Sequence, residues 1–183
     1  MPVTTQYNEF TLFPEVSYKC IKHMMSNNEL IWRLLQYNDA NAYREDTTHA
    51  NLTTEQKGAL IYDGIRKETD CRVFMDTGAD YSWTDQVAIL RITPIELIPT
   101  NYIYGNMAIA FEVYSHYKIN QLSNYQTRLN MITQQIISVF NGTEVGGLGR
   151  LYFDSYSSSR SKMQVIGQIP YKGNAVIMCN WTV

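Results

Sequence analysis

The order of apolar and polar residues along the chain follows two periods, and each period predicts a kind of secondary structure. Apolar residues spaced three and four positions apart predict helices over residues 26–38 and 123–141, with a shorter helix after Thr53. Each predicted start has the spacing of a capping box, in which Ser or Thr is followed three residues later by Glu or Gln. These pairs are Ser26 with Glu29, Thr53 with Gln56, and Ser123 with Gln126. Gly142 follows the longest helix, where a glycine C-cap is expected.

Shorter runs that alternate between apolar and polar residues, or that are apolar throughout, predict strands. The predicted strands are residues 71–76, 86–94 and 107–119 before the long helix, and residues near 148–155, 163–169 and 175–182 after it. Strands on both sides of one strongly amphipathic helix predict an α+β fold. We expect a mostly antiparallel sheet with two or three helices packed on one face.

The length of 183 residues is enough for one domain with a core of its own. Residues 1–25 show no sustained period, so we expect an N-terminal arm there and a single α+β domain over residues 26–183. Hydrophobic residues make up 45% of the chain, which excludes general disorder. Charged residues make up only 17%, against about a quarter in typical soluble domains, while tyrosine is abundant. Such a composition favours protein interfaces, and a tyrosine-rich core is the alternative.

Charge and residue content exclude several classes of function. The formal net charge is −2 and there is no long basic run, so binding to DNA through neutralised phosphates is not expected. No stretch is long and apolar enough for a membrane span, and the first residues lack the features of an export signal. Three widely spaced cysteines favour reduced thiols in a cytoplasm. Because His23, His49 and His116 have no His or Cys at ligand spacing, we expect no metal site, and we expect no cofactor.

The most specific catalytic string is Asp76-Thr77-Gly78-Ala79-Asp80, which follows an apolar run and resembles the active-site motif of retroviral-type aspartic proteases. In that family two chains each contribute an Asp, and the pair activates a water molecule. The resemblance implies a homodimer with Asp76, Thr77 and Gly78 in its site. Those enzymes are nearly all β, however, whereas helices are the best-defined elements here. We therefore interpret the string as turn chemistry, with local Asp and Thr hydrogen bonds and a glycine at positive φ, and keep the protease as the alternative hypothesis.

The second half of the chain, roughly residues 92–181, carries another resemblance. Its features are the strand at 108–116, a helix with Arg128 and residues 132–140, Asn141-Gly142 at its end, the segment 146–153, and Tyr171-x-Gly173. In these features the chain resembles the head-to-tail joining and tail terminator proteins of tailed bacteriophages. The resemblance implies helices against one face of a sheet, rings that are usually hexameric or dodecameric, and no bond-breaking chemistry.

The same resemblance implies where the protein works and with which partners. We expect a virion protein, assembled in the host cytoplasm, that forms a homo-oligomeric ring in the neck and contacts neighbouring neck, portal or tail tube proteins. DNA would only pass through the lumen. Loops at 39–53, 76–86 and 155–163 are the expected contact regions, and deleting residues 41–51 is expected to leave the domain folded while blocking joining. The candidate interface residues are Asn41, Tyr43, Arg44, Tyr81, Trp83, Arg160 and Lys162.

Overall fold

One six-stranded sheet forms the centre of the fold. The computed structural model describes residues 15–75, 86–99, 105–146, 150–153 and 175–182. The strands are β1 (Val73–Phe74), β2 (Ala88–Pro99), β3 (Gly105–Ser115), β4 (Thr143–Glu144), β5 (Arg150–Phe153) and β6 (Ala175–Thr182). Their order across the sheet is β1-β2-β3-β6-β5-β4, and every neighbouring pair is antiparallel except β1 with β2. Both outermost strands are only two residues long.

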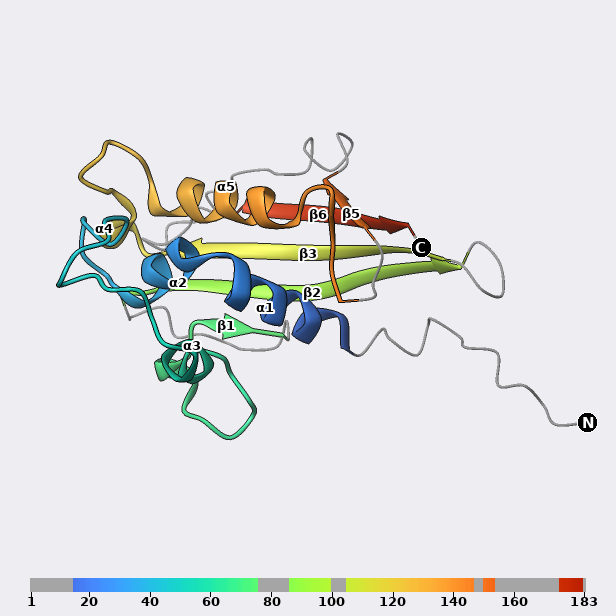
Figure 1. Ribbon diagram of the computed structural model, residues 1–183, viewed down its shortest axis with the longest axis horizontal. Coiled ribbons are helices and arrows are strands. Elements are labelled where there is room, and N and C mark those ends of the chain that lie inside the picture. Colours follow the sequence, from blue (N-terminus) through green and yellow to red (C-terminus); the bar gives the residue numbers. More distant parts are fainter. Residues whose placement is uncertain (1–14, 76–85, 100–104, 147–149, 154–174, 183) are drawn as a thin grey trace, which may run out of the picture.

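Helices cover one face of this sheet (Figure 1). They are α1 (Val16–Asn27), α2 (Glu29–Gln36), α3 (Thr54–Ala59), α4 (Tyr117–Asn120) and α5 (Arg128–Phe140), with a short 3-10 helix at Glu68–Asp70. Helices α1 and α2 pack on β2, while α5 packs on β3 and β6 and against α2. Helix α3 lies beyond β1, and α4 directly follows β3 at one end of the sheet (Figure 1). The predicted α+β class, with a mostly antiparallel sheet and helices on one face, is confirmed.

The core lies between the helices and this face of the sheet. Alternate residues of β3, including Phe111, point into it because side chains of a strand alternate between the two faces. The ring of Phe111 lies 4.7 Å from the ring of Phe140 at the end of α5, measured between centroids. A smaller cluster forms around Ile89 and Tyr114, whose neighbours Leu90 and Val113 belong to the main core. The sheet is therefore apolar on both faces in its central strands.

The expected irregular arm over residues 1–25 differs from the structure for residues 16–25, which belong to helix α1. Val16, Cys20 and Met24 are spaced four residues apart and are fully buried, so α1 supplies a side of the core. The helical period covers barely three turns, and the proline-containing residues before it obscure it in the sequence. Residues 1–14 lie outside the described residues.

Two of the three predicted capping boxes were misplaced. Ser26 lies in the last turn of α1, and Asn28 caps α2 by accepting a hydrogen bond from the N–H of Ile31 at 2.8 Å. Similarly, α5 begins at Arg128 and is capped by Thr127, not by Ser123. Asn and Thr, like Ser, are among the preferred N-cap residues, so the pattern alone could not choose between neighbouring starts.

Of the remaining predicted boundaries, two are confirmed, one differs from the structure and one cannot be compared with it. The capping box of Thr53 and Gln56 at the start of α3 is confirmed. Gly142 has a φ of 73° directly after the C-cap of α5, as expected for a residue in the left-handed region. The strand predicted over residues 107–119 ends at Ser115, and the following residues turn into α4. The strand predicted at 163–169 lies outside the described residues.

Candidate assembly surface

A long loop between α2 and α3, residues 37–53, contains neither helix nor strand. It lies at the same end of the molecule as α4 and the segment that leads into α5 (Figure 1). We call residues 37–53 and 116–127 together the loop platform. The two segments touch directly, because the N–H of Ser123 donates to the carbonyl oxygen of Ala40 at 2.9 Å.

Arg128, at the start of α5, holds the platform together from below. Its guanidinium is fully buried and donates only to backbone carbonyl oxygens. The acceptors are Ile119 at 3.0 Å, Leu34 at 2.5 Å, Tyr37 at 2.6 Å and Asp39 at 2.7 Å. Three of these carbonyls lie at or just after the C-terminus of α2, where helix carbonyls lack partners and a cation is favoured. One side chain thereby joins α2, α4 and α5.

Burial lowers the pKa of Arg128 to about 10, and the charge of Asp39 opposes that shift. The guanidinium therefore remains protonated at neutral pH, which the four carbonyl oxygens require of it. A neutral or shorter side chain could not satisfy all four acceptors.

His49 fixes the middle of the long loop. Its side chain is buried and lies between two carboxylates, with Nε2 2.8 Å from Asp39 Oδ2 and Nδ1 3.0 Å from Asp46 Oδ1. The ring of Tyr37 meets the imidazole edge-on at 5.2 Å between centroids. Hydrogen bonding to Asp39, and then to Asp46, raises the pKa of His49 above its ordinary value against the opposing effect of burial. The protonated imidazole can donate to both carboxylates at once.

The two carboxylates respond in the opposite direction. Desolvation alone would raise the pKa of Asp39, but the N–H of Asn41 and the side chain of His49 together bring that pKa below its ordinary value. The pKa of Asp46 is lowered first by the backbone N–H of His49. Arg33, from the last turns of α2, adds a bond from Nη2 to the carbonyl oxygen of Tyr43 at 3.3 Å. The inner side of the loop is thus held by charged groups.

The structure brings together three of the predicted interface residues of this loop: Arg44 is exposed, whereas Asn41 and Tyr43 are partly buried and Tyr43 also packs against the main core. Arg44 Nε donates to the hydroxyl of Tyr43 at 3.0 Å, and its guanidinium lies 5.5 Å from the centre of that ring. Ser123 Oγ lies 3.2 Å from the Tyr43 hydroxyl and donates to Asn41 Oδ1 at 2.7 Å. The predicted residues Tyr81, Trp83, Arg160 and Lys162 lie outside the described residues.

The contacts of the long loop also bear on the expected effect of deleting residues 41–51. Ala42 is fully buried in the main core, and His49 is buried beneath the loop. Removing these residues would open the core and take away the partners of the Arg33 and Asp39 side chains that lie in the loop. Point substitutions of outward side chains are therefore the suitable test of the loop.

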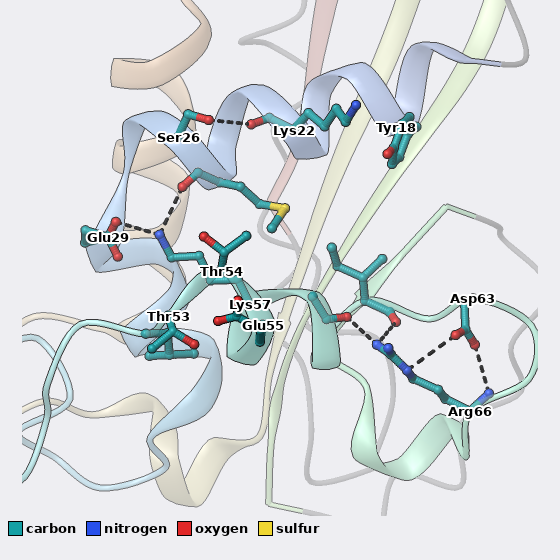
Figure 2. A pocket seen from close by; sticks show the side chains of 14 residues that line it. Tyr18, Lys22, Ser26, Glu29, Thr53, Thr54, Glu55, Lys57, Asp63 and Arg66 are labelled. Atoms are coloured by element: carbon teal, nitrogen blue, oxygen red, sulfur yellow. Dashed lines mark hydrogen bonds and ion pairs between the residues drawn. The ribbon is translucent and has the colours of Figure 1, made fainter.

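A groove of about 1050 Å³ lies between α1 and α3 (Figure 2). Its central side chain is Lys57, which is buried and directed towards Glu29, with 2.5 Å between Nζ and Oε1. The same Nζ donates to the carbonyl oxygen of Met25 at 3.0 Å, at the end of α1. Arg66 pairs with Asp63 at the other end of the groove (Figure 2). The bonds of Lys57 to Glu29 and to the carbonyl oxygen of Met25 thus join α3 to α2 and α1.

The part of the chain that the structure describes contains no group of three or more His, Cys, Asp or Glu residues able to hold a metal ion. None of its helices has the length and apolar character of a membrane span. The string of the protease hypothesis, Asp76, Thr77 and Gly78, lies outside the described residues. The described architecture, a sheet covered by helices on one face, differs from the nearly all-β architecture of those enzymes.

Fold and platform together define an α+β protein with one helix-covered sheet and a prearranged surface of polar and aromatic side chains at one end. The chain belongs to the YomW family, whose model matches residues 28–171. This family is phage-derived, and its name comes from the Bacillus phage SPbeta region. The protein is therefore phage-associated. No curated protein and no solved structure matches the chain.

Proposed function

We propose that this protein is a structural subunit of a ring in the phage neck, acting as a tail terminator or head-to-tail connector without catalysis. Its partners would be further copies of itself, forming a hexamer or dodecamer, together with neighbouring neck, portal or tail tube proteins. DNA would pass through the lumen of the ring. The phage-derived family and the resemblance over residues 92–181 support this role.

The observation that carries the proposal is the construction of the loop platform. Its inner side is fixed by Arg128 and His49, so the outer side is already ordered before any partner arrives. A prearranged surface avoids the entropy cost of ordering a loop on binding. Tyr, Arg and Asn, as in Asn41, Tyr43 and Arg44, are residue types suited to protein interfaces. This arrangement favours assembly over chemistry.

Deleting the gene from the phage or prophage that encodes it tests the role directly. We expect DNA-filled heads and separate tails to accumulate, as counted by electron microscopy of lysates, and wild-type protein supplied in trans to restore joined particles. Complete, infectious particles in the absence of the protein would refute the neck assignment.

Complementation with a point variant tests the platform itself. Arg44→Glu changes an exposed residue of the platform, and we expect it to reduce the number of joined particles because it reverses a charge at the interface. Lys22→Glu is the matched control, since Lys22 is also exposed but lies on α1, away from the platform. If both variants gave equal numbers of joined particles, the platform would not be needed for the neck function.

A further inference from the structure

Two side chains are far more exposed than any other large apolar group of the described residues. Tyr125 is 96% exposed and Ile65 is 92% exposed, whereas the next, Tyr117, reaches 53%. Tyr125 lies in the turn before α5, and Ile65 lies in the loop that follows α3. The two turns stand on opposite sides of the sheet and helices (Figure 1), so they cannot meet within one copy of the chain.

Tyr125 lies in a hydrogen-bonded turn, and its own backbone conformation is unfavourable. Its φ is 65°, in the left-handed region that side chains with a Cβ rarely adopt. The turn is closed by hydrogen bonds from Leu122 N–H to the carbonyl of Gln126 at 2.9 Å and from Tyr125 N–H to the carbonyl of Leu122 at 3.2 Å. The exposed ring gains almost no burial that would offset the strain. A strained and exposed aromatic side chain is expected where a partner supplies the missing contact.

Ile65 is likewise presented by a built turn. Asp63 Oδ1 accepts hydrogen bonds from the N–H groups of Ile65 and Arg66, both at 2.9 Å. Arg66 forms an ion pair with Asp63, with 3.3 Å between Nε and Oδ2, and its Nη1 donates to the carbonyl oxygens of Gly58 and Ile61. The apolar side chain is therefore held out at the tip of a fixed loop.

The charges around the two turns are complementary. Residues 116–127 contain one formal charge, that of Lys118, and Arg44 lies on the adjoining part of the platform. Neither Lys118 nor Arg44 forms an ion pair within the described residues. Three carboxylates accompany Arg44 in its loop, and all have partners: Asp39 and Asp46 are bound to His49, and Glu45 pairs with Arg33. Residues 62–70 contain three carboxylates and two cations, a formal charge of −1. The Ile65 segment, with a formal charge of −1, can thus face the Tyr125 segment, whose formal charge is +1.

We propose that the Ile65 turn of one copy docks on the Tyr125 turn of the next copy, so that subunits associate head to tail. This inference rests on the proposed ring function and names its subunit contact. Two different surfaces in contact make a heterologous interface, which generates a closed ring when the rotation between copies closes.

Sedimentation velocity of the full-length protein over a series of concentrations tests the contact. We expect the wild type to form oligomers larger than a dimer. Tyr125→Gly and Ile65→Ser should each weaken association at least about tenfold, because each removes the apolar anchor from one side of every contact. Ile137→Ser, which alters an exposed residue of α5, is the control and should associate like the wild type.

An equimolar mixture of the two variants gives the decisive result. Tyr125→Gly keeps an intact Ile65 turn and Ile65→Ser keeps an intact Tyr125 turn, so one contact can form between them. Head-to-tail docking therefore predicts that the mixture forms dimers and nothing larger. Since both positions are exposed, the variants should stay folded, and circular dichroism checks this. Arg44→Glu should also associate more weakly than the wild type. Association of the wild type should itself weaken as the salt concentration rises.

Three outcomes would overturn the contact. They are a wild type that stays monomeric at every concentration, an Ile65→Ser variant that associates normally, and a mixture that gives no dimers. None of them decides the neck function, which the count of joined particles in the gene deletion tests separately. A ring that still forms in both variants would be compatible with the neck role but would show that the two turns do not form its subunit contact.

Discussion

Replacing Arg128 by methionine should reveal how much the buried guanidinium contributes to stability. Methionine has a similar length and fits an apolar site, but it cannot donate hydrogen bonds. Two of the four acceptors, the carbonyls of Leu34 and Ile119, are bonded in fully buried contacts, whereas those of Tyr37 and Asp39 are only partly buried and can bind water instead. A buried polar group left without a partner costs about 1–3 kcal/mol.

Two such carbonyls at about 2 kcal/mol each give a loss of about 4 kcal/mol in the free energy of unfolding. Removing a charge from the interior offsets part of this loss, so we expect a net decrease of about 3 kcal/mol. This is a large share of the 5–15 kcal/mol, roughly, that stabilises a typical domain.

Urea unfolding followed by circular dichroism measures the change, with Arg150→Met as the control because Arg150 is exposed. The control should change stability by no more than about 0.5 kcal/mol. An Arg128→Met protein within about 1 kcal/mol of the wild type would show that the carbonyl bonds do not hold the platform.

Three further predictions concern the loop, the groove and the exposed turn. The pKa of His49 is raised in the folded state, so protonated His49 stabilises the fold fully below its ordinary pKa of 6.5, and this stabilisation is lost as pH rises through the folded pKa. Urea titrations at several pH values should show this decline in the free energy of unfolding. His49→Gln should abolish the decline. Lys57→Met should cost about 1–3 kcal/mol of unfolding free energy, since Met25 O and Glu29 lose their donor, while exposed Lys22→Met should cost almost nothing. Tyr125→Gly should stabilise the fold by about 0.5–1 kcal/mol because glycine accepts a φ of 65°, and a lower melting temperature would contradict that reasoning.

Sequence patterns predicted those helices and strands whose formation depends mainly on residues close together in the chain. The periods of α2, α5 and the central strands depend only on which face of each element is buried, so the α+β class followed from them. Helix starts were harder, because Ser26, Asn28, Ser123 and Thr127 are all competent caps and tertiary packing selects among them.

The candidate site depended on contacts that no local pattern records. Asn41, Tyr43 and Arg44 stood out as part of a polar loop too long to be a simple connection. Arg128, however, binds carbonyls about ninety residues earlier in the chain, and an arginine in the first turn of an amphipathic helix usually stays in solvent. His49 could be interpreted as a surface or hydrogen-bonded core residue rather than a metal ligand, but the sequence does not show that Asp39 and Asp46 are its partners.

The two-residue strands at both margins of the sheet have a consequence for behaviour at high concentration. A chain that adds to a sheet must satisfy a row of main-chain N–H and C=O groups, and β1 and β4 provide very few of them. On the β1 side, Ile61 already forms a bridge to Val73. Addition of a further chain along β1 or β4 is thereby disfavoured.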